Sequence, residues 1–62
     1  MLRKMRALIA ENEDTVAGTV AFILESECNA EVKTVATGSD AIKAVSGETF
    51  DLVLCASHLP QA

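Results

Sequence analysis

The sequence predicts an α/β fold in which three short parallel strands alternate with two helices. Short apolar or β-branched runs at residues 6–10, 31–36 and 51–55 have the length and composition of buried strands. The stretches between them, residues 15–27 and 40–46, place apolar side chains at helical spacing. Because strands and helices alternate through short connections, we expect a parallel sheet with right-handed crossovers in one small domain, residues 1–62.

The first strand is followed by four polar residues, 11–14, after which Asp14 or Thr15 can cap a helix. The apolar spacing predicts that this first helix buries a stripe of Val16, Val20 and Ile23. Its flank and opposite side carry small residues and one aromatic, namely Ala17, Gly18, Ala21 and Phe22. Such a face lets another helix approach closely and is a candidate interaction surface; a mildly apolar surface with no partner is the alternative.

The second strand, residues 31–36, leads into a Gly38-Ser39-Asp40 turn in which Ser39 can cap the next helix. That helix, residues 40–46, is expected to bury Ala41, Ile42 and Val45 and to stop at Gly47. The third strand, residues 51–55, is apolar at consecutive positions, which is typical of a strand covered on both faces.

Composition excludes several classes of function. The chain has 62 residues and a net charge of −4, which argues against a nucleic-acid surface because phosphate contacts need clustered Lys and Arg. The only basic cluster, Arg3, Lys4 and Arg6, is interpreted as a solvated leader to the first strand. No segment approaches the ~18 apolar residues that span a bilayer, so we expect a cytoplasmic protein with no membrane contact.

The two cysteines give little support to redox or metal chemistry. Cys28 and Cys55 are far apart in sequence and form no C-x-x-C pattern, so they are interpreted as unpaired small hydrophobes. A small redox or metal protein that uses Cys28, Cys55 and His58 remains a third reading, which metal analysis would reveal.

Three marks together resemble the first half of the receiver domain of two-component response regulators. They are the acidic cluster at residues 11–14, the Thr37–Ala41 turn, and the strand from Asp51 to Leu54 leading to Leu59-Pro60. The resemblance covers the chain from about Arg6 to Pro60. It implies a flavodoxin-like β-α-β-α-β half with a three-stranded parallel sheet of order 2-1-3, so that the chain is a truncated receiver-like domain.

The resemblance also implies a site that has lost its chemistry. The family's acidic pair, which holds Mg²⁺, falls on Glu11 and Asn12, and its phosphoacceptor aspartate falls on Ala56. His58 stands where a backbone carbonyl usually ligates the metal, and the family's later hydroxyl and lysine have no counterpart. We therefore expect no catalytic residue, no enzyme activity, no cofactor, and only a degenerate metal remnant at Glu11, Asn12 and His58.

These observations predict a non-catalytic interaction module of a phosphorelay signalling system, with a sensor kinase or output domain as a possible partner. The alternative is a fragment of an active phosphoacceptor regulator whose aspartate at position 56 was lost naturally or by engineering. The residue encoded at that position in the parent gene, and whether the gene continues beyond Ala62, would separate the two.

The implied strand order also predicts self-association. It leaves Leu52, Val53 and Leu54 at an open sheet edge, and such an edge recruits another strand. We further expect Leu8, Ile9 and Val53 to meet water on one side, which would favour a homo-oligomer.

Overall fold

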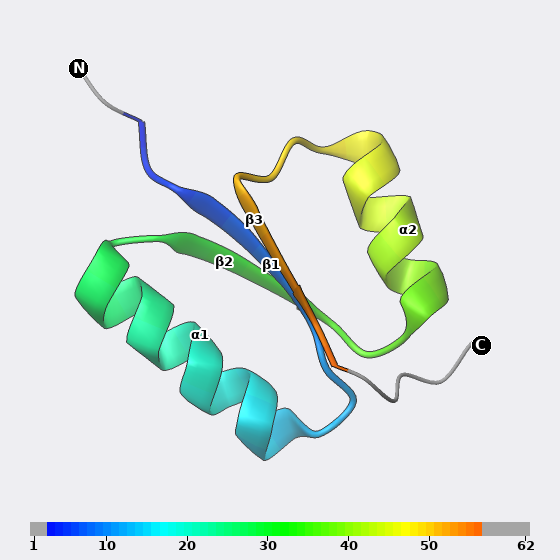
Figure 1. The fold of residues 1–62 in the computed structure, drawn as a ribbon, viewed down its shortest axis with the longest axis horizontal. Coiled ribbons are helices and arrows are strands. Elements are labelled where there is room, and N and C mark those ends of the chain that lie inside the picture. The colour runs from blue at the N-terminus through cyan, green and yellow to red at the C-terminus, as the bar shows by residue number, and fades with distance from the viewer. Residues whose placement is uncertain (1–2, 57–62) are drawn as a thin grey trace.

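The computed structural model describes residues 3–56 and has the predicted fold class (Figure 1). The sheet is parallel, with strand order β2-β1-β3, and is half of a flavodoxin-like arrangement. Its elements are β1 (Arg6–Ala10), α1 (Asp14–Cys28), β2 (Glu31–Val35), α2 (Gly38–Gly47) and β3 (Leu52–Cys55).

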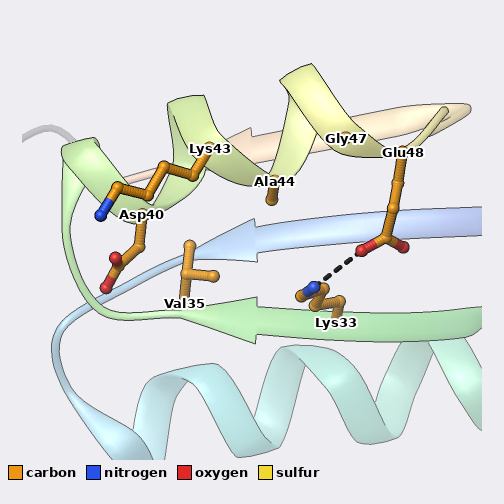
Figure 2. A pocket seen from close by; sticks show the side chains of 7 residues that line it. All are labelled: Lys33, Val35, Asp40, Lys43, Ala44, Gly47 and Glu48. Carbon is orange, nitrogen blue, oxygen red and sulfur yellow. Dashed lines mark hydrogen bonds and ion pairs between the residues drawn. The ribbon is translucent and has the colours of Figure 1, made fainter.

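The two helices cover opposite faces of the sheet, with the strands between them (Figure 2). Helix α1 packs on β2 and β1, and α2 packs on β1. Successive side chains of a strand point to opposite faces, and in β1 Leu8 and Ala10 point toward α2, where they meet Ala41 and Ala44. Neither helix packs on β3 as closely as on β1.

The central strand carries the core. Ala7, Leu8 and Ala10 are fully buried and Ile9 is 3% exposed. The expectation that Leu8 and Ile9 meet water is therefore wrong, because each face of β1 has its own helix. Val53 of β3 is 43% exposed, so water reaches the edge strand as expected.

Helix α1 turns a different face inward from the one its bulky residues suggest. Ala17 is the buried residue of this helix, whereas Val16 and Ile23 are 42% and 50% exposed. Small alanines allow the helix to approach the sheet closely, and the helix sits over β2 and β1 rather than over β3. Of the predicted interaction face, Ala17 is buried and Ala21 is half-buried, whereas Gly18 and Phe22 are exposed as expected.

Helix α2 differs from its prediction in the same way. It begins two residues early, at Gly38, and Thr37 caps it by accepting a hydrogen bond from the Asp40 N–H at 3.0 Å. Ala41 and Ala44 are buried, but Ile42 and Val45, both expected inside, are 67% and 46% exposed. The residue pair that faces the sheet is again the small one.

The basic cluster is largely exposed, as expected, and two of its members, Arg3 and Arg6, also form ion pairs. Arg3 binds both carboxylate oxygens of Asp51, at 2.7 and 2.8 Å, and the backbone N–H of Arg6 donates to the same carboxylate at 2.8 Å. These bonds hold the pKa of Asp51 at about 2, with the Arg3 side chain as the main cause. The Arg6 guanidinium contacts Glu31 and Glu48 and lies 5.1 Å from the centre of the Phe50 ring. Arg3 and Arg6 therefore bind the segment that precedes β1 to Asp51, the residue before β3.

Candidate functional site

The C-terminal ends of β1 and β3 bring Glu11 and Ala56 to the same edge of the sheet. The Ala56 N–H donates to the Ala10 carbonyl at 2.9 Å, and the Glu11 N–H donates to the Val35 carbonyl, also at 2.9 Å. Parallel strands place their carboxyl ends together, which is where ligand sites form in open α/β sheets. Ala56 occupies this position with a methyl group, which can neither attack an electrophile nor bind a cation.

The carboxylate of Glu11 has a local structural partner. Its Oε2 accepts a hydrogen bond from the Glu13 N–H at 3.0 Å, just before the first turn of α1. Glu13 is the N-cap residue and its side chain makes no capping bond, so neither Asp14 nor Thr15 caps the helix as expected. Glu11 instead places negative charge at the helix N-terminus, where it is favourable without a metal.

The residues at this edge do not fit the Mg²⁺ ion that the resemblance implies. Mg²⁺ prefers an octahedral set of oxygen ligands, usually with carboxylates among them. Glu11 offers one carboxylate, Asn12 only an amide oxygen, and Ala56 no side-chain donor. Within residues 3–56, no three His, Cys, Asp or Glu side chains gather as a metal site would require. His58, the third member of the predicted remnant, lies outside the described residues.

Strand β3 forms an open edge of the sheet. Among residues 3–56, the sheet order leaves β3 hydrogen-bonded to β1 alone. Leu52, Val53, Leu54 and Cys55 include no charged residue and no proline, which are the usual devices that protect an edge. The opposite edge, β2, carries Glu31 and Lys33, and both are exposed. The charged residues of β2 therefore protect that edge against pairing with another strand, whereas β3 has no such protection.

Both helices expose apolar side chains. On the α1 face, a pocket of about 120 Å³ lies between the helix and β3, lined by Ile9, Ala10, Glu11, Val16, Val20, Leu54, Cys55 and Ala56. On the other face, Ile42 and Val45 of α2 are exposed, and neither lines the pocket above β2. The predicted edge residues Leu52, Val53 and Leu54 thus belong to a sheet whose two covering helices both expose apolar side chains, and those of α1 lie beside Leu54.

A larger pocket of about 340 Å³ lies above β2 on the α2 face, and sequence reasoning missed it (Figure 2). It is lined by Lys33, Val35, Asp40, Lys43, Ala44, Gly47 and Glu48. Lys33 is bound to Glu48 at 2.7 Å, and this lysine and Arg6 lower the pKa of the Glu48 carboxyl, Lys33 more strongly. With two acidic and two basic residues in its wall, the pocket has no net charge to select a ligand.

The two cysteines are not brought together. Cys28 ends α1 and Cys55 ends β3, and both are free, as predicted, and exposed. The described residues therefore place no redox pair at either end of the sheet.

No protein family, curated protein or solved structure gives a match to this chain. None of the helices within residues 3–56 is long and apolar enough to cross a bilayer.

Sequence reasoning did not identify the exposed apolar side chains of the helices, because it assigned the bulky residues, and not the alanines, to the buried faces. Ala17, Val20, Ala21 and Leu24 also follow helical spacing, and so do Ala41 and Ala44. Helical stripes that include alanines would have identified the faces that pack on the sheet. They would then have left Val16, Ile23, Ile42 and Val45 as candidate contact residues.

Proposed function

We propose that this chain is a non-catalytic, receiver-like interaction module of a cytoplasmic two-component phosphorelay, and that it binds proteins through β3. The observation that carries the proposal is the composition of β3 and its tip. The strand is an uncharged open edge with exposed Val53 and Leu54, and it is followed by Ala56, which lies at the same end of the sheet as Glu11.

The absence of catalysis is argued from the donor set. Phosphoryl transfer depends on a positioned nucleophile and on cations that neutralise the transferred oxygens. Ala56 supplies no nucleophile, Asn12 supplies no charge, and Glu11 is hydrogen-bonded to the Glu13 N–H. The arrangement supports recognition rather than turnover.

Binding through β3 follows from the chemistry of sheet edges. An unpaired strand offers a row of main-chain donors and acceptors, and an added strand satisfies them while side-chain pockets supply specificity. The exposed apolar side chains of α1 and α2 would supply such contacts on either face. A sensor kinase, an output domain or another copy of the chain are the partner classes that this proposal implies.

The catalytic half of the proposal is tested with acetyl phosphate and Mg²⁺, followed by intact-mass measurement. We expect no phosphoryl adduct on the wild-type chain. The Ala56→Asp variant should also remain unmodified, because Asn12 still replaces a metal carboxylate. An acid-labile, stoichiometric adduct on the wild type would overturn the proposal, whereas an adduct on Ala56→Asp alone would favour the fragment of an active regulator.

Binding through β3 is tested against sensor kinases and output domains whose genes lie next to the gene for this chain. We expect saturable binding that is lost when Val53, which is exposed on β3, is replaced by lysine. Thr34→Lys on β2 is the control and should bind normally. Equal binding by both variants would show that β3 is not the contact strand.

A further inference from the structure

We propose that a second copy of this chain pairs with β3, strand to strand and antiparallel, across a two-fold axis perpendicular to the sheet. Val53 would lie opposite Val53 of the second copy, giving a continuous six-stranded sheet. This inference rests on the proposed function, since it names one partner for the same edge strand.

The register of the sheet shows why β3, and not β2, is the edge that pairs. The same β1 residue has one neighbour on each side: Leu8 lies between Lys33 and Val53, and Ile9 lies between Thr34 and Leu54. At both levels β2 is polar and β3 is apolar. Lysine on an edge strand opposes pairing, so β2 is protected at the level where β3 is open.

Self-pairing of β3 joins like with like. In an antiparallel pair, residues directly opposite each other share a face of the sheet. With Val53 opposite its own copy, Leu52 lies opposite Leu54 of the second copy. The two leucine pairs then lie on the face that carries α1, and the valine pair lies on the face that carries α2. Exposed Val53 and Leu54, at 43% and 38%, are thereby withdrawn from water.

Charge favours the antiparallel orientation. The carboxyl end of the sheet bears Glu11, Glu13 and Asp14, with no lysine or arginine between residues 7 and 32. At the other end, Arg3 binds Asp51, which neutralises the acidic residue that precedes β3. An antiparallel pair keeps the acidic carboxyl ends of the two copies apart, whereas a parallel pair would bring them together.

The same surface serves both copies, so one chain is sufficient. A two-fold interface is self-complementary, and each copy supplies one apolar strand with unpaired backbone groups. No second kind of partner is needed to satisfy the open backbone groups of β3.

Sedimentation velocity over a micromolar concentration range tests the pairing. The wild type should be a dimer that added salt does not weaken, because each copy has a net charge of −4 and screening reduces the repulsion between them. Val53→Lys places on β3 a lysine at the level of Leu8, where β2 already carries Lys33. It should raise the dissociation constant of the dimer by more than about tenfold, because the two new lysines would lie opposite each other. Thr34→Lys, on the opposite edge, should leave the dimer intact, and circular dichroism verifies that both variants fold.

Cysteine cross-linking tests the register. In a background with Cys28→Ser and Cys55→Ser, the Val53→Cys variant should form an intermolecular disulfide on mild oxidation, because opposite residues in an antiparallel pair come within disulfide reach. Lys33→Cys, at the same level on β2, should not cross-link. A monomeric wild type, a dimer unaffected by Val53→Lys, or cross-linking only at position 33 would overturn the inference.

These results are separable from the proposed function. A monomer that takes no phosphoryl group and still binds a kinase through β3 would overturn self-pairing alone. A dimer that becomes phosphorylated would leave the pairing intact and overturn the non-catalytic role.

Discussion

Leu8 should be the side chain on which folding depends most. It is the largest fully buried residue of the chain and packs in the cluster with Ala41, Ala44, Val35 and Phe50. Replacing a buried leucine by alanine costs about 2–5 kcal/mol, which includes the cavity left behind. A 62-residue domain has a total stability of about 3–9 kcal/mol at typical values per residue. Leu8→Ala should therefore lose a large part or all of the free energy of unfolding.

Urea unfolding followed by circular dichroism measures this loss, with Leu54→Ala as the matched control. Leu54 is 38% exposed, so about three fifths of its side chain is buried. Because full burial contributes ~1.5–3 kcal/mol, Leu54→Ala should lower the free energy of unfolding by about 1–2 kcal/mol. If Leu8→Ala does not fold, Ile9→Val, at 3% exposure, should still show a loss of about 0.5–1.5 kcal/mol. Equal losses at positions 8 and 54 in dilute solution would refute the assignment of the core to β1.

Three further predictions concern single residues and ions. Gly18→Ala should raise the free energy of unfolding by about 0.5–1 kcal/mol, because a Cβ there meets no atom within 4 Å; an unchanged urea midpoint would contradict this. Asp51→Asn should lower the melting temperature at pH 7, and the difference from wild type should disappear between pH about 4 and about 2. The pKa of Asp51 is lower in the folded chain, so its carboxylate stabilises the fold fully above the unfolded pKa near 3.9, and this stabilisation is lost as pH falls through the folded pKa of about 2. A difference in melting temperature that stays constant down to pH 2 would exclude the Arg3–Asp51 pair as the source of the stabilisation. Millimolar Mg²⁺ should leave the melting temperature unchanged, and a saturable rise would show that Glu11 is part of a working metal site.

The candidate site was only partly predictable. The neighbouring positions of Glu11 and Ala56 follow from a parallel sheet, because the ends of β1 and β3 must meet once strand order 2-1-3 is adopted. The hydrogen bond from the Glu13 N–H to Glu11 depends on the exact path of the chain into α1, which spacing does not reveal. The pairing of Arg3 with Asp51 joins residues 48 positions apart and has no local signal.

The sequence alone determined the element types and their order, because strand and helix periodicity are local properties of a few consecutive side chains. The bounds of β1 agree fully with the prediction, β2 and β3 each differ by one residue at one end, and the two helices differ by one or two residues at each end. Only the tertiary structure decided which face of each helix packs. The choice of Ala17 over Val16, and of Ala44 over Val45, depends on where the helix sits across the sheet and how closely it approaches. That placement leaves the bulkier residues exposed, so the chain has apolar surface still to cover.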